Sequence, residues 1–239
     1  MQAPAAVVFD VFGTLVDWYT SISERARRIA ARAGVELDAE RLTVLWRGRY
    51  GPALDAVRLR QRPWCDLDQL HRESLAETLA ELGVRLAEAD QEELVAGWHQ
   101  LRPWPGVPEA LAQLRRLLPV AALSNGHIRL LIDLTRYAGL SFDTLLSAEL
   151  AGTYKPHPAV YQTAARLLGL APDRVVLVAC HGWDLAGARQ AGLRTAHLPR
   201  PTEWGPNAPA RAVPEADITA SDITDLVGRI ALLATPASG

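Results

Sequence analysis

The sequence predicts an α/β protein: a doubly wound, mostly parallel sheet with a helical subdomain inserted after its first strand. Three observations predict this class. Short, continuous apolar runs at residues 5–11, 120–126 and 175–182 are typical of strands buried on both faces of a parallel sheet. Segments with helical periodicity alternate with these runs. The long stretch between the first two runs has no strand-like pattern.

Length and composition indicate one large domain, or a core with a subdomain. The chain has 239 residues, of which 49% are hydrophobic and 22% charged, so it is globular rather than disordered. The formal net charge of -2 lacks the basic excess of a nucleic-acid binder. Cys65 and Cys180 have no metal-ligand spacing, which argues against a disulfide framework and structural zinc.

Compartment and partners follow from the same reading. No apolar run reaches the roughly 18 residues of a membrane span. Residues 1–6 lack the charged and apolar regions of a signal peptide. We therefore expect a soluble, cytoplasmic protein without nucleic-acid or membrane partners.

The elements are expected in a definite order along the chain. The first strand ends at Asp10 and is broken by Gly13. Helical segments follow near 20–33, 39–60, 67–82 and 89–100, and Pro and Gly residues mark the return to the core at 103–108. Two further strands and a weaker one at 194–198 come next, each flanked by a helix, then an irregular segment at 200–214 and a helix near 222–233. We assign residues 1–17 and 102–239 to an α/β core domain and 18–101 to a helical cap subdomain.

Polar residues stand at the carboxyl ends of the predicted strands. Asp10, Ser124-Asn125 and the segment 181–184 are distant in sequence, but parallel strands bring such ends together, where ligands bind. A carboxylate buried there needs hydrogen-bond donors and can serve as a nucleophile. Local alternatives remain open: the strand-end and helix-start residues can be caps, Thr14 can close a turn, Tyr161 can be core, and Arg47 can be one of many solvated arginines.

Four motifs in order resemble the haloacid dehalogenase (HAD) superfamily. They are Asp10-Val11-Phe12-Gly13-Thr14-Leu15, Ser124-Asn125-Gly126, Lys155-Pro156 and Gly182-Trp183-Asp184. The resemblance covers roughly residues 5–200 and implies a HAD-like core with a cap at 18–101. Magnesium-dependent members usually carry a second acidic residue two positions after the nucleophile, where this chain has Phe12. Since Mg²⁺ requires several oxygen ligands, the resemblance points to chemistry without a metal or another cofactor.

Further matches are similar to the L-2-haloacid dehalogenases. These matches are Trp46-Arg47, Lys155-Pro156-(x)-Pro158-(x)-(x)-Tyr161, Trp183-Asp184-(x)-(x)-Gly187-Ala188 and Pro201-(x)-Glu203-Trp204-Gly205. The resemblance implies hydrolysis of short (S)-2-haloalkanoic acids to 2-hydroxy acids through an ester on Asp10. By analogy with such enzymes, a homodimer is expected.

The resemblance also implies a role for each site residue. Lys155 separates the nucleophile from Asp184, which is the candidate base or orienter of the water, and Thr14 bonds to Asp10. Arg47 and Asn125 receive the departing halide. The substrate carboxylate is bound by Ser124 and by backbone N–H groups of the loop containing Val11 and Phe12. Trp183 is expected to face the substrate, and Tyr161 to line the site.

The last motif departs from the dehalogenase pattern. Where the family commonly has Ser and Asn, this chain has Ala179 and His181. His181 is interpreted as a replacement donor or as a base near neutral pH. We hypothesise that a histidine donor suits a small, hard leaving group, including fluoride from fluoroacetate. Two other functions stay open: a magnesium-dependent phosphatase acting on a small phosphate ester, and a non-catalytic binding protein.

Overall fold

A six-stranded sheet organises the core of the protein in this computed structural model, which describes residues 3–209 and 212–234. All neighbouring strands in it are parallel, in the order β5-β4-β1-β6-β7-β8. The strands are β1 (Ala6–Phe9), β4 (Val120–Ser124), β5 (Thr144–Ser147), β6 (Val175–Ala179), β7 (Arg194–His197) and β8 (Ile218–Thr219). The predicted parallel α/β class is therefore confirmed.

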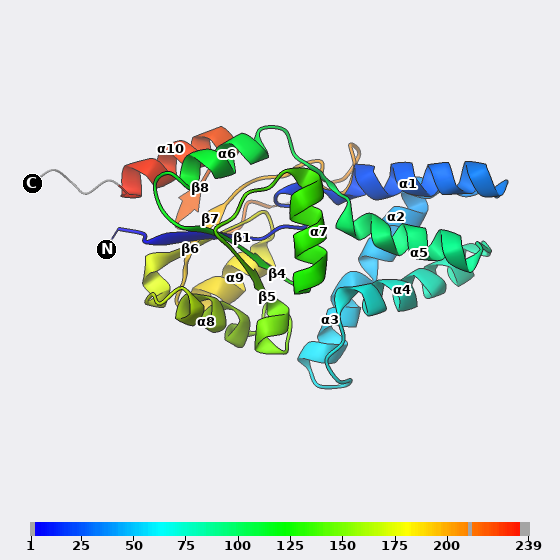
Figure 1. The fold of residues 1–239 in the computed structure, drawn as a ribbon, viewed down its shortest axis with the longest axis horizontal. Coiled ribbons are helices and arrows are strands. Elements are labelled where there is room, and N and C mark those ends of the chain that lie inside the picture. Colours follow the sequence, from blue (N-terminus) through cyan, green and yellow to red (C-terminus); the bar gives the residue numbers. More distant parts are fainter. Residues whose placement is uncertain (1–2, 210–211, 235–239) are drawn as a thin grey trace, which may run out of the picture.

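Helices cover both faces of this sheet. Figure 1 shows α6 (Val107–Leu114) and α10 (Ile223–Ala234) together on one side, with α8 (Pro158–Leu167) and α9 (Gly182–Gln190) on the other. Helix α7 (Ile128–Ala138) follows β4. Short 3-10 turns lie at Ala148–Ala151 and Pro172–Arg174. Strands β1, β4 and β6 are buried along their whole length, which explains why they read as continuous apolar runs.

Five helices occupy the region between the first two core strands. They are α1 (Trp18–Ala33), α2 (Ala39–Gly48), α3 (Tyr50–Arg58), α4 (Leu67–Leu82) and α5 (Glu88–Ala96), followed by a 3-10 turn at Gly97–His99. Figure 1 places them at the end of the molecule opposite to the labelled termini. A two-stranded antiparallel pair, β2 (Val16–Asp17) with β3 (Arg102–Pro103), joins this region to the core. We keep the name cap for residues 18–101, as our interpretation of this helical region.

The ends of the cap helices follow local sequence signals. The side chain of Asp17 accepts a hydrogen bond from Thr20 N at the start of α1, and Asp66 does the same for Gln69 N at α4. Gly34 and Gly83 end these two helices with φ of +66°, which glycine adopts without steric cost. The segment predicted as one helix over 39–60 is instead two, because the chain turns at Arg49 between α2 and α3.

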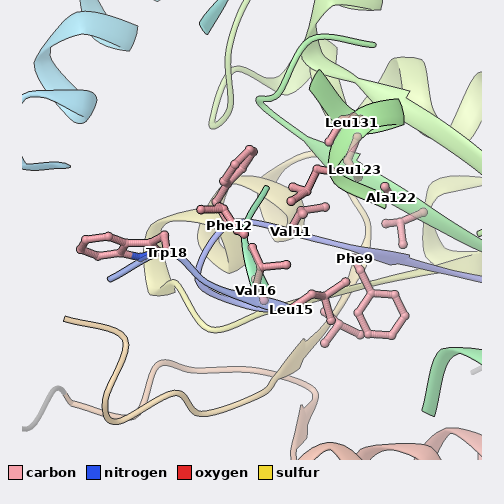
Figure 2. Packing of buried hydrophobic residues seen from close by; sticks show 14 of the residues in the cluster. Phe9, Val11, Phe12, Leu15, Val16, Trp18, Ala122, Leu123 and Leu131 are labelled. Carbon is pink, nitrogen blue, oxygen red and sulfur yellow. The ribbon is translucent and has the colours of Figure 1, made fainter. Parts of the chain in front are cut away.

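The loop after β1 is anchored by its apolar side chains. Figure 2 shows Val11 and Phe12 on the side of Leu123 within the buried cluster, and Leu15 nearer to Val16 and Phe9. Because these side chains are at most 3% exposed, they hold the backbone of the loop in place under the site. Within the described ranges, no helix combines the length and apolar character needed to cross a membrane.

Candidate active site

The switch point of the sheet brings the predicted residues together. The chain runs from β1 to β4 on one side and later returns to β6 on the other, so the crevice at the carboxyl ends lies beside β1. Asp10 follows β1, Ser124 ends β4, and His181 follows β6 by two residues. Asp10 and His181 lie within hydrogen-bond distance of each other, and Lys155 contacts both Asp10 and Asn125.

Asp10 is a buried carboxylate with donors on both oxygens. Its Oδ2 accepts hydrogen bonds from Thr14 Oγ at 2.7 Å and from His181 Nδ1 at 3.1 Å, and its Oδ1 accepts one from Lys155 Nζ at 3.1 Å. Burial alone would raise the pKa of Asp10, but Lys155 and then His181 oppose it and hold the pKa well below its ordinary value. The group is therefore an anion at neutral pH.

Lys155 joins the two acids of the site. It is the single lysine of the chain, and its Nζ donates to Asp184 Oδ2 at 2.6 Å as well as to Asp10. Asp184 is fully buried, and its Oδ1 accepts from the Tyr161 hydroxyl at 2.7 Å. Burial raises the pKa of Asp184, and Asp10 adds to this while Lys155 opposes it. Asp184 is the third residue of α9 rather than its cap, which is His181, so the alternative of a plain N-cap is wrong.

His181 lies between two carboxylates. Its Nδ1 faces Asp10 and its Nε2 lies 2.9 Å from Glu203 Oε1, while its ring stacks on Trp183 at 5.5 Å between centroids. Burial would lower the pKa of His181, but Cys180, Asp10 and Glu203 raise it well above its ordinary value. A protonated imidazole has two donors and no acceptor. This favours the donor interpretation of His181 over the base.

Arg47 closes the site from the cap. It is only 6% exposed, so the alternative of a solvated arginine is wrong. The guanidinium lies 3.9 Å from the Tyr50 ring centre and also faces Trp18 and Trp98, and Arg47 Nη1 is buried without a hydrogen-bond partner. The Nη1 donor therefore remains available to an anion.

A cavity of about 430 Å³ separates the cap from these core residues. It is lined by Arg47, Gly48, Tyr50, Gly51, Leu54, Asp55, Arg58, Lys155, Pro156, His181, Trp183 and Trp204. Its residues come from the cap and from three separate parts of the core. The cavity has the size and mixed lining of a small-molecule site.

The remaining predicted residues support the loops beneath the cavity. Ser124 Oγ accepts from Gly126 N, and Asn125 Oδ1 accepts from Lys155 N at 2.8 Å. Neither side chain caps α7, whose N-cap is His127. The Phe12 ring packs edge-on against Trp98, and Val11 is fully buried. Their side chains thus belong to the core, so only their backbone groups are left for a substrate.

The donor set does not fit Mg²⁺. Such an ion needs several oxygen ligands in an octahedral arrangement. Here Asp10 and Asp184 already accept from Lys155 Nζ and from hydroxyl groups, and the position two residues after Asp10 is the apolar Phe12. Two cationic side chains would also lie beside the metal. We therefore derive no step through a metal.

The sequence reasoning missed most of the cap residues that line the cavity, and it missed two residues that contact the charged groups of the site. Tyr50 lies three residues after Arg47, across the turn at Arg49, and its ring packs against the guanidinium. Glu203 bonds to His181, and also to Trp18 Nε1 at 3.1 Å. Two signals pointed to these residues: the short spacing between Arg47 and Tyr50, and the match at residues 201–205. The contact between Glu203 and His181, however, joins a loop to a strand end 22 residues away, and a single sequence does not reveal such a contact.

Together, the fold and the site define a hydrolase class: a doubly wound core with a carboxylate nucleophile candidate at its central strand. Haloacid dehalogenase-like hydrolases match this chain over residues 4–192, and the chain belongs to that family.

Individual relatives are similar over most of the chain. A crystal structure of an L-2-haloacid dehalogenase is 45% identical, covers 96% of this chain and 99% of its own, and has a TM-score of 0.91. A defluorinating L-2-haloacid dehalogenase is 37% identical, with 96% and 98% covered and a TM-score of 0.92. The (S)-2-haloacid dehalogenase of Xanthobacter autotrophicus is 33% identical over 82% of this chain and 75% of its own. A structure of an L-2-haloacid dehalogenase from that organism, with chloropropionic acid covalently bound, is 28% identical, covers 95% and 98%, and has a TM-score of 0.80.

Proposed function

We propose that this protein hydrolyses short (S)-2-haloalkanoic acids to 2-hydroxy acids through an ester on Asp10, without a metal. The observation that carries the proposal is the buried Lys155, which bonds to both Asp10 and Asp184 beside a cavity closed by Arg47. The relatives described above bear names of the same activity.

The first step is a displacement at carbon. Asp10 Oδ1 attacks the carbon that bears the halogen, the carbon–halogen bond breaks, and the halide leaves with the bonding electrons. The low pKa of Asp10 keeps its carboxylate unprotonated for this attack. Arg47 is the proposed halide acceptor, because its buried guanidinium has an unpartnered donor. Asn125 assists it, and Ser124 with the backbone of residues 11–12 binds the substrate carboxylate.

The second step hydrolyses the ester. Asp184 takes a proton from water, whose oxygen bonds to the Asp10 carboxyl carbon. The bond from that carbon to Oδ1 then breaks, and Oδ1 leaves as the hydroxyl oxygen of the hydroxy acid, with the proton returned by Asp184. The water oxygen stays in the Asp10 carboxyl group, which releases the second proton of the water to solvent as it ionises. The raised pKa of Asp184 makes its carboxylate a stronger base than an ordinary aspartate. Tyr161 and Lys155 fix its orientation through the bonds described above.

Three finer statements belong to the same proposal. Fluoroacetate is a candidate substrate, supported by the donor at His181 and by the name of the defluorinating relative. A homodimer and a cytoplasmic location are proposed as well. Light scattering coupled to size exclusion tests the dimer, and cell fractionation tests the location.

The test of the activity is halide release from both enantiomers of 2-chloropropionate and from fluoroacetate, with EDTA present. Release from the S enantiomer that persists in EDTA and is abolished by Asp10→Asn supports the proposal. Asp173→Asn is the matched control, since Asp173 is an exposed carboxylate in the turn before β6. Absence of release, together with magnesium-dependent hydrolysis of p-nitrophenyl phosphate, would instead indicate a phosphatase. Binding of small carboxylates without any turnover would indicate a non-catalytic protein.

A further inference from the structure

The Glu203 carboxylate is buried beside the site, yet neither of the proposed steps uses it. It is 4% exposed and lies in the irregular segment after β7. Its Oε1 accepts hydrogen bonds from His181 Nε2 at 2.9 Å and from Trp18 Nε1 at 3.1 Å. Glutamate is rarely buried to this extent unless it is paired. Here its charged partner is His181, which in turn touches Asp10.

Glu203 is held close to the loop that carries Asp10. Gly13 has φ of +83°, and a Cβ at this position would collide with the Glu203 carboxylate. Arg200, three residues earlier, donates from Nε to the carbonyl oxygen of Thr14 at 2.8 Å. The segment 200–203 is thus joined to the nucleophile loop at two points. Glycine at position 13 leaves the space that this approach requires.

The two oxygens of Asp10 have different partners. Oδ1 has the Lys155 ammonium, whereas Oδ2 has the Thr14 hydroxyl and the His181 ring. When Oδ1 forms the ester bond, Oδ2 becomes the carbonyl oxygen. Water attack then moves the carbonyl electron pair onto Oδ2. Two donors, one of them cationic, already face that atom, which is the arrangement of an oxyanion hole.

We propose that Glu203 is a positioning residue that orients His181 and keeps it cationic, so that His181 and Thr14 stabilise the oxyanion on Asp10 during ester hydrolysis. This inference rests on the proposed function. It assigns Glu203, the third buried carboxylate of the site, to the hydrolysis of the ester. Water supplies the oxygen, Asp184 takes the proton, and Oδ2 holds the charge until the bond from the carboxyl carbon to Oδ1 breaks. No oxidant or further reactant is needed.

The charged and titratable groups around His181 agree with this role. Asp10 faces it from the end of β1, Glu203 from the segment after β7, and Cys180 adjoins it in the chain. Lys155 lies on the far oxygen of Asp10, and Arg47 lines the same cavity. Removal of the Glu203 charge leaves two cations and fewer anions near the ring. His181 would then lose its proton at a lower pH.

The test is Glu203→Gln, measured by rapid-quench halide release from (S)-2-chloropropionate and by intact-protein mass spectrometry. We expect a halide burst of about one per active site, followed by turnover slowed about 10- to 100-fold, because only the second step loses stabilisation. The ester adduct on Asp10 should accumulate in the mass spectrum. The steady-state rate of the variant should also fall as pH rises through the lowered pKa of His181, whereas the rate of the unmodified protein should not fall there.

Two further variants distinguish positioning from a merely structural role. In a His181→Asn background, Glu203→Gln should have at most a twofold additional effect, because its route to Asp10 is already gone. Glu203→Asp keeps the charge and should preserve the pH profile. Should the Gln variant fail to fold, the Asp variant must show a weaker form of the same burst. Equal slowing of burst and turnover, or effects that multiply in the double variant, would overturn the proposal.

A measurement that does not depend on turnover separates this proposal from the proposed function. Imidazole NMR on the protein, which has six histidines, follows the protonation of His181, assigned by its loss in His181→Asn. We expect the ring to stay protonated at pH 8 in the unmodified protein and to titrate lower in Glu203→Gln. If no halide is released but this shift is seen, the function fails while the positioning by Glu203 stands. If Glu203→Gln leaves the titration of the His181 ring unchanged, the positioning role of Glu203 is refuted, whatever the activity.

Discussion

Replacement of Lys155 by Met tests the central arrangement of the site most directly. The Lys155 side chain is fully buried, and its Nζ bonds to Asp10 at 3.1 Å and to Asp184 at 2.6 Å. Met fills a similar volume but removes the charge. It leaves two buried carboxylates facing each other, with only His181 and hydroxyl donors to compensate.

The expected loss of stability is large. Removal of one partner from a buried ion pair typically costs about 3–5 kcal/mol, because the other charge stays buried without compensation. In a domain of this size, each kcal/mol lowers Tm by about 2–4 °C, so Tm should fall by about 6–20 °C. Arg116→Met is the control, since it removes an exposed cation far from any role in the site.

The loss of stability in Lys155→Met should depend on pH. In the unmodified protein the pKa of Asp10 is lowered, so its contribution to stability is present above the unfolded pKa of about 4 and is lost as pH falls through the folded value. Without Lys155, burial dominates and raises the folded pKa of Asp184 further, so ionisation above pH ~4 costs stability. The stability difference between the two proteins should therefore widen from pH 4.5 to 7.5.

Urea unfolding at several pH values measures this difference, and halide release measures the activity. We expect turnover of Lys155→Met to be at least about 100-fold lower at pH 7 and to rise with pH, because Asp184 must ionise to act as a base. A stability difference that stays constant across this pH range would refute the reasoning. So would a variant within 1 kcal/mol of the unmodified protein.

Three further predictions follow from individual contacts. Arg47→Met should keep the fold but lower turnover by about 100-fold and weaken product inhibition by chloride, because the buried guanidinium is the proposed halide acceptor. Unchanged inhibition by chloride would exclude this role for Arg47. Tyr161→Phe removes one hydrogen bond to Asp184 and should lower kcat by about 10-fold with little change in KM, as steady-state kinetics can show. Burial would lower the pKa of His99, but Asp68 and Asp133 raise it. The stability that His99 contributes is therefore present below its unfolded pKa of about 6.5 and is lost as pH rises through the folded value. The Tm of His99→Gln should lack this dependence on pH.

The sequence predicted the core of the fold because buried parallel strands leave a clear pattern. The runs that became β1, β4 and β6 are apolar on both faces. Strands β5 and β8 were not predicted. The first carries exposed and half-buried residues at Thr144 and Leu145, and the second has only two residues, so neither has a recognisable apolar run.

The sequence predicted which charged residues come together in the candidate site, but not the residues that surround them. Asp10, Lys155 and Asp184 stand in a motif order that a sequence reveals, and they do meet in the structure.

What only the tertiary structure decided is the environment of each charge. The Trp46-Arg47 match singled out Arg47 by resemblance, but its burial depends on aromatic rings from other elements and could not be predicted from the sequence around it. The state of His181 likewise depends on Glu203, which reaches it from a loop after another strand. Sequence patterns report local periodicity and composition. Burial and pairing of charges arise only when distant segments pack together, and these decide what each side chain can do.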